Sequence, residues 1–99
     1  SAYTVSETLL KRLAMGNAPP FFIIGSDDLS LRWLQSHRAA LQHLGAVGML
    51  VQAETEADVR RVAERAQDLP ITLGSASDIA QALGITRYPV LITANGIEQ

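Results

Sequence analysis

Three observations predict that this sequence folds as a single α/β domain around a mixed β-sheet. Short, continuously apolar runs alternate with longer segments of helical period, which is typical of parallel strands joined by right-handed helical crossovers. Pro89 stands at the mouth of a Val-Leu-Ile-Thr strand, a position where proline is tolerated in a sheet. An Asn-Gly pair then separates this strand from a last apolar segment, and a two-residue loop of this kind is a strong signal for an antiparallel hairpin.

The first 20 residues predict a helix and a stiff connector ahead of the main unit. Thr4 and Glu7 have the spacing of a capping box, and leucines follow on one side of the helix that they begin. The segment Asn17-Ala18-Pro19-Pro20 forbids continuation of that helix. We therefore expect residues 1–20 to form an N-terminal helix with a Pro-rich connector, and residues 21–99 to form the domain.

The next segment predicts a strand, a long helix and a second strand. Residues 21–25 form a continuously apolar run, as expected of a strand that is buried on both faces. Ser26-Asp27-Asp28 supplies the N-cap of a helix from about Leu29 to Leu44, which Gly45 ends. Residues 46–51 read as a second buried strand.

Two further helices and three further strands complete the prediction. Thr55 and Asp58 begin a helix that Pro70 breaks, and its inner face is expected to carry Val59, Val62, Ala66 and Leu69. Residues 71–73 predict a short strand. Ser75 and Asp78 cap another helix, which bears Ile79, Ala80 and Leu83. The last strands are expected at 90–93 and 97–99, the second of them with an open edge suited to pairing with more chain or a partner.

Composition excludes several classes of function. The net charge is −2, and the seven arginines and single lysine are spread along the chain, so a direct nucleic-acid surface is not expected. The absence of cysteine excludes disulfides, thiolate catalysis and cysteine-ligated metal. No apolar run reaches the roughly 20 residues that a membrane-spanning helix needs. Composition leaves the oligomeric state and the cellular compartment open.

The order of elements in residues 21–99 resembles a thioredoxin-like domain. In that fold a β-α-β unit is followed by a cis proline that leads into two antiparallel strands, with helices on both faces of the sheet. The resemblance implies a cis Tyr88-Pro89 bond, and X-Pro bonds are the ones in which cis costs little. The helix from Thr55 to Leu69 and the short strand after it read as an insertion between the two halves.

Four segments are similar to a protein family carried on bacterial integrative and conjugative elements. They are Phe-Ile-Ile-Gly-Ser-Asp-Asp, Trp-Leu, Leu-Gly-Ala-Val-Gly-Met-Leu-Val, and the run Arg-Tyr-Pro-Val-Leu-Ile-Thr-Ala-Asn-Gly-Ile-Glu-Gln that ends the sequence. The resemblance implies work in conjugative DNA transfer, inside an assembly at the bacterial envelope or in the periplasm, with other conjugation proteins as partners. It implies no particular biochemical activity.

In a redox-active thioredoxin, two cysteines lie at the junction between the first strand of the unit and its helix. The corresponding residues here are Ser26-Asp27-Asp28-Leu29-Ser30, so disulfide exchange is excluded. A helix N-terminus stabilises the anionic form of a carboxylate, which makes it a poor nucleophile and a poor proton donor at pH 7. We therefore interpret Asp27 and Asp28 first as helix-capping residues, with metal binding or partner recognition as the alternatives.

Arg87-Tyr88-Pro89 forms the other half of the expected site. In thioredoxin-like proteins, the residue before the cis proline pairs its backbone with an extended peptide. The functional hypothesis is thus a peptide or partner groove, made of Ser26, Asp27, Asp28, Arg87, Tyr88 and Pro89. The alternative interpretation is that Pro89 only shapes the loop and that Tyr88 packs against Trp33.

These expectations favour a redox-inactive interaction or assembly module of the conjugative machinery. His37 and His43 are six residues apart on one helix and do not share a face, so a metal site is not expected there. We predict no catalytic residue, no cofactor and no metal ligand. The competing hypotheses are a metal-dependent enzyme that uses Asp27 and Asp28, and a purely structural domain of a longer protein.

Overall fold

The computed structural model describes residues 19–74, 88–93 and 96–98, the last three by their backbone only. The helices expected near residues 6–14 and after Ser75 lie outside the described residues, as does Arg87. The described elements are β1 (Phe21–Gly25), α2 (Asp28–Leu44), β2 (Val47–Gln52), α3 (Glu56–Ala66), β3 (Ile71–Leu73), β4 (Val90–Thr93) and β5 (Gly96–Glu98).

The strands form one mixed sheet in the order β3-β2-β1-β4-β5. The β1–β2 and β2–β3 pairs are parallel, whereas β4 runs antiparallel to both β1 and β5. A parallel β-α-β unit flanked by an antiparallel C-terminal pair is the thioredoxin-like arrangement, so the predicted fold class is confirmed. The β3 strand extends the sheet beyond β2, where the sequence predicted an insertion.

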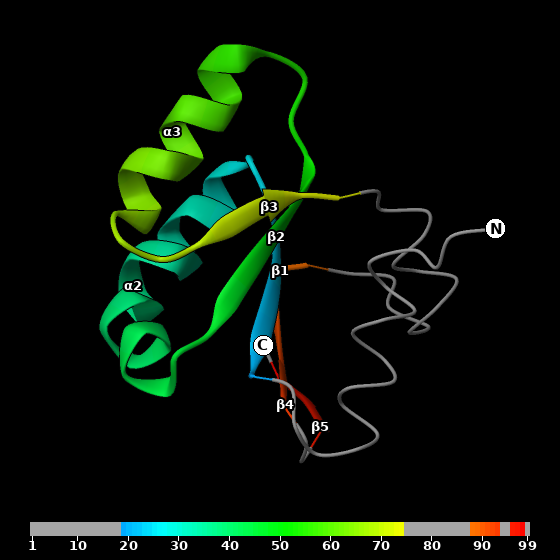
Figure 1. The fold of residues 1–99 in the computed structure, drawn as a ribbon. Helices are drawn as coiled ribbons and strands as arrows, with labels where there is room; N and C mark the ends of the chain where they lie inside the picture. The colour runs from blue at the N-terminus through cyan, green and yellow to red at the C-terminus, as the bar shows by residue number, and fades with distance from the viewer. Residues whose placement is uncertain (1–18, 75–87, 94–95, 99) are drawn as a thin grey trace, which may run out of the picture.

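Both described helices lie on the same face of the sheet (Figure 1). Because successive residues of a strand point to opposite faces, β1 divides its apolar side chains between two cores. Phe22 and Ile24 join the helix-face cluster, whose buried members are Phe22, Ile24, Leu31, Leu34, Leu41, Ala46, Leu50, Val62, Ala66 and Leu69. Phe21 and Ile23 join the opposite-face cluster, which consists of Phe21, Ile23, Met49, Val90 and Ile92.

The ends of α2 follow the capping chemistry in the sequence. Asp27 is the N-cap, with an extended backbone and a carboxylate that accepts the N–H of Ser30 at 3.4 Å. At the other end Gly45 adopts the left-handed conformation, with φ of 67°, and its N–H bonds to the carbonyl of Gln42. Glycine adopts this conformation without the penalty that a Cβ would bring, so the helix ends where it was predicted to end.

The start of α3 is as predicted, but its end and one of its inner residues are not. Thr55 and Asp58 form a complete capping box. The helix ends at Ala66, because Gln67 has a positive φ of 53° and turns the chain before Pro70 is reached. The predicted extension to Leu69 is therefore wrong. Val59 is exposed, whereas Val62, Ala66 and Leu69 are buried, so the inner stripe begins one turn later than predicted.

The chain enters β4 through a cis peptide bond between Tyr88 and Pro89, as the resemblance implied. Thr93 of β4 pairs with Gly96, which is therefore the first residue of β5. The predicted Asn-Gly loop and the predicted strand start at residue 97 are wrong by one residue. The register explains the difference, because pairing of Ile92 with Ile97 leaves Gly96 opposite Thr93.

Candidate functional site

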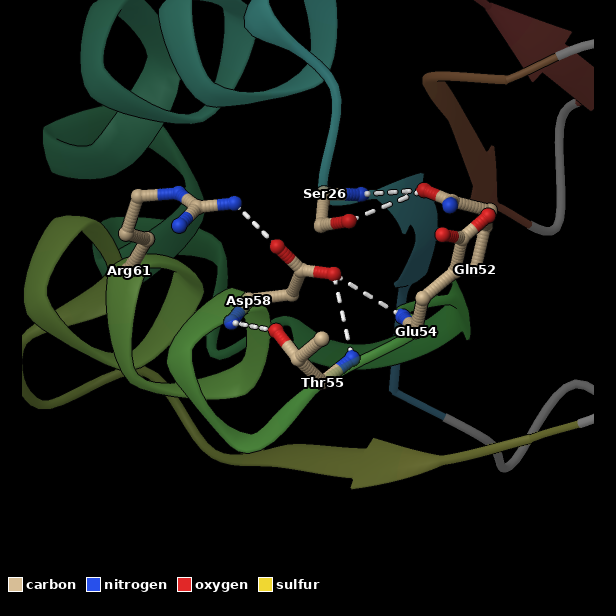
Figure 2. A network of polar contacts seen from close by, with 6 residues as sticks. All are labelled: Ser26, Gln52, Glu54, Thr55, Asp58 and Arg61. Atoms are coloured by element: carbon tan, nitrogen blue, oxygen red, sulfur yellow. Dashed lines mark hydrogen bonds and ion pairs between the residues drawn. The ribbon is translucent and has the colours of Figure 1, made fainter.

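Ser26, at the junction between β1 and α2, is bound to the end of the neighbouring strand. Its backbone N–H and its hydroxyl both donate to Oε1 of Gln52, at 3.2 and 2.9 Å (Figure 2). The Ser26 side chain is buried, with 8% of the residue exposed. The hydroxyl is therefore engaged in holding the junction to β2.

Ser30 fixes the same junction from the first turn of α2. It is fully buried, and its Oγ accepts the backbone N–H of Gly25 at 2.9 Å. Its own N–H donates to Asp27, so the cap and the end of β1 are held by one residue. Neither Ser30 nor Gln52 had a role that the sequence pattern predicted. The sequence signal for these two residues is weak, because each bonds to a backbone or hydroxyl group that comes close only when the chain folds.

Tyr88 lies directly against the end of β1. A Cβ placed on Gly25 would collide with Cε1 of the Tyr88 ring and would stand only 2.7 Å from Oδ1 of Asp27. The aromatic ring of Tyr88 and the carboxylate of Asp27 thus both approach Gly25, which has no side chain. Glycine is required here for close approach, and the two halves of the expected site meet at this point.

Tyr88 does not pack against Trp33, so the alternative interpretation of this tyrosine is wrong. Tyr88 is half-buried against the opposite-face cluster, together with the strand residues of that face. Trp33 packs on the helix-face cluster, with its ring centroid 6.0 Å from that of Phe22. The sheet separates the two side chains, because Tyr88 packs on the opposite-face cluster and Trp33 on the helix-face cluster.

Four of the six expected site residues meet at this end of the sheet. Asp27 is exposed at the N-cap, Ser26 and Pro89 are buried, and Tyr88 is half-buried. Asp28 instead lines a cleft with residues of α2 and α3. Arg87 lies outside the described residues.

Asp58 organises the neighbouring N-terminus of α3 (Figure 2). Its Oδ2 accepts the backbone N–H groups of Glu54 and Thr55, at 2.9 and 3.1 Å, and its Oδ1 pairs with Arg61. These interactions, the Glu54 hydrogen bond first among them, hold the pKa of the Asp58 carboxyl below its ordinary value of 3.8. The carboxylate is fully used in capping and in this ion pair.

Among the described residues, no group of three or more His, Cys, Asp or Glu side chains is placed to hold a metal ion. His37 is exposed, stacks on Trp33 at 4.7 Å between ring centroids, and lies with Nδ1 2.8 Å from the Trp33 carbonyl oxygen. His43 is exposed as well, near the end of α2. Over the same described ranges, every helix is too short or too polar to cross a bilayer.

The sheet topology and the cis proline are compatible with a thioredoxin-like α/β arrangement, and the sequence contains no cysteine. The chain belongs to the family described as "Protein of unknown function (DUF2859)", whose model matches residues 3–97. No curated protein and no solved structure matches the chain.

Proposed function

We propose that this domain is a redox-inactive interaction or assembly module of bacterial integrative and conjugative elements, and that it binds other proteins of the conjugation machinery at the cell envelope. The observation that carries the proposal is the meeting of Tyr88, Asp27 and Gly25 at one end of the sheet. The sequence resemblance to proteins of conjugative elements supports the biological setting. The lack of cysteine supports binding in place of thiol chemistry.

The recognition surface in this proposal is the groove that Asp27, Tyr88 and Pro89 frame. Asp27 is exposed and its Oδ2 accepts the cap hydrogen bond, so Oδ1, which lies close to Gly25, is the oxygen left for a partner. The ring supplies apolar area with a polar tip, a combination that is common at protein interfaces. Ser30 and Gln52 hold the backbone that presents these groups, which reduces the entropy cost of binding.

The test is complementation of DNA transfer. A donor strain that lacks the gene is supplied with the full-length protein, either unchanged or carrying Tyr88→Ala or Tyr88→Phe. Tyr88→Ala is expected to lower the frequency of conjugative transfer by about tenfold or more, since an aromatic anchor of an interface commonly contributes about 2 kcal/mol. Tyr88→Phe keeps the ring on Gly25 and is expected to retain most of the transfer.

Two outcomes contradict the proposal. If Tyr88→Ala folds, as judged by circular dichroism and thermal melting, and still supports full transfer, the groove is not the binding surface. If deletion of the gene leaves transfer unchanged, the role in conjugation fails. If the domain is purely structural, the transfer frequency of each variant is instead expected to fall only as far as its thermal stability falls.

Asp27 allows the cap and the partner contact to be separated. Asp27→Ser keeps a good N-cap but removes the carboxylate, whereas Asp27→Ala removes both and costs about 1 kcal/mol of stability. If the carboxylate contacts a partner, Asp27→Ser lowers transfer without a change in thermal stability. Full transfer in Asp27→Ser, with a loss only in Asp27→Ala, assigns Asp27 to capping alone.

A further inference from the structure

Three arginines between α2 and α3 have no ion-pair partner in the described part of the chain. That part contains five arginines. Arg60 and Arg61 pair with Glu56 and Asp58 on their own helix. The other three, Arg32, Arg38 and Arg65, have no carboxylate within 4.0 Å among the residues described. In the described part of the chain, the arginines without an ion pair therefore all belong to α2 or α3.

The unpaired arginines gather where the two helices pack. Arg38 of α2 donates from Nη1 to the backbone carbonyl of Arg65 on α3, at 3.1 Å. This hydrogen bond uses one of the five N–H donors of Arg38 and none of the donors of Arg65. Arg32 and Arg65 both line a cleft between the helices, with a volume of about 320 Å³.

The lining of the cleft suits one kind of ligand. Its walls are Asp28, Leu31, Arg32, Gln35 and Arg65. Arg32 is exposed, Arg65 is half-buried and Leu31 is buried, so the lining combines two arginine side chains with one buried apolar residue. Asp28 and Arg32 have the i, i+4 spacing of a helical ion pair, yet they do not form one. The Arg32 guanidinium therefore remains available to a ligand.

We infer that this cleft binds a carboxylate side chain of an acidic polypeptide segment. A guanidinium fork matches the two oxygens of a carboxylate, and the Gln35 amide adds a neutral donor. The carboxylate of Asp28 in the cleft lining favours a polypeptide ligand over a free phosphate. Its negative charge disfavours a multiply charged anion, whereas it accepts a backbone N–H such as the one beside an acidic side chain.

This surface is independent of the proposed groove. The cleft lies between helices on one face of the sheet, whereas the Tyr88 ring belongs to the opposite-face cluster. Variants of the cleft arginines and of Tyr88 therefore test two separate contacts. Loss of acidic-peptide binding leaves the groove proposal standing, and the reverse also holds.

The experiment measures peptide binding by isothermal titration calorimetry on the 99-residue chain. The probe is a short blocked peptide of alternating Glu and Ala, and the matched neutral probe alternates Gln and Ala. Arg32→Gln and Arg65→Gln are each expected to weaken binding of the acidic peptide about tenfold, as loss of a charge-assisted hydrogen bond does. Arg60→Gln is the matched control, because it removes an arginine of α3 that pairs with Glu56 outside the cleft.

Several results would overturn the inference. One is failure of the acidic peptide to bind at about 1 mM, and another is binding no tighter than that of the neutral peptide. An equal loss in Arg60→Gln and in the cleft variants would mean that only net charge matters. Competition by inorganic phosphate as strong as that by the peptide would assign the cleft to phosphate. Circular dichroism of each variant verifies that the helices remain.

Discussion

The ring of Tyr88 occupies the space beside Gly25 in which any other residue would carry its Cβ. This contact joins the end of β1 to the residue before the cis proline that leads into β4, from opposite halves of the domain. It makes Gly25, the last residue of β1, a position at which packing requires glycine.

Replacing Gly25 by alanine is expected to destabilise the domain by about 1–3 kcal/mol, because the new methyl group has to displace the Tyr88 ring. Urea denaturation measures the change. The double variant Gly25→Ala/Tyr88→Ala relieves the clash, so its loss is expected to be smaller than the sum of the two single losses. Additive losses would show that the ring does not limit this position.

Ser30→Ala is expected to cost about 1–3 kcal/mol, since it leaves the buried N–H of Gly25 without an acceptor. Ser36→Ala is the control, because Ser36 is exposed on the same helix and is expected to change stability by no more than about 0.5 kcal/mol. Both values come from chemical denaturation. Equal losses of stability in the two variants would contradict the role of Ser30 at the junction between β1 and α2.

Substitution of two leucines can test which face of α2 packs on the sheet. Leu34 is 0% exposed and Leu29 is 57% exposed. Leu34→Ala leaves a cavity in the helix-face cluster and is expected to cost about 2–5 kcal/mol. Leu29→Ala is expected to stay within about 0.5 kcal/mol of the unchanged chain. If the two losses were reversed, the helix would lie on the sheet with a different face.

The pH dependence of stability should contain a contribution from Asp58. Its pKa in the folded chain lies below the ordinary value of 3.8, mainly because the Glu54 N–H donates to the carboxylate. The folded state therefore holds the proton less tightly than the unfolded state does. The stabilisation is present above pH 3.8 and is lost as the pH falls below that value, through the folded pKa.

The measurement is the urea midpoint at a series of pH values from neutral to strongly acidic. Asp58→Asn is expected to flatten the acid limb of this profile relative to the unchanged chain. Arg61→Gln is expected to keep most of the limb, because the backbone hydrogen bond of Glu54 contributes more than the ion pair. A profile of Asp58→Asn that matches the unchanged chain would contradict this assignment.

The alternation of apolar runs with capped helices was sufficient to predict the fold class. Asp27, Gly45 and Thr55 act through residues close in sequence, so the helix boundaries they set were readable. The end of α3 was not, because Gln67 takes a positive φ that its residue type does not favour. The register of β5 depends on pairing with β4, which a local loop motif does not determine.

The candidate site was predictable only in part. Proximity of Tyr88 to the β1–α2 junction followed from the resemblance. The face on which Tyr88 lies was not predictable, because Tyr88 is outside β4 and its position depends on packing against the opposite-face cluster. The hydrogen bonds of Ser26 were not predictable, because their acceptor, Gln52, is 26 residues further along the chain. The α2–α3 cleft needs both helices in place, so the arginines that line it appear scattered in the sequence.

The position of β1 between β2 and β4 has a consequence for how the chain is made. Synthesis delivers β1 and β2 early, but β4 emerges only after a long intervening segment. Until Val90 is available, the residues Phe21–Gly25 form a strand with one unpaired edge. An apolar edge of this kind pairs readily with other chains. A chain that stops before β4 is therefore expected to aggregate on the ribosome or soon after release, and to be removed by proteolysis.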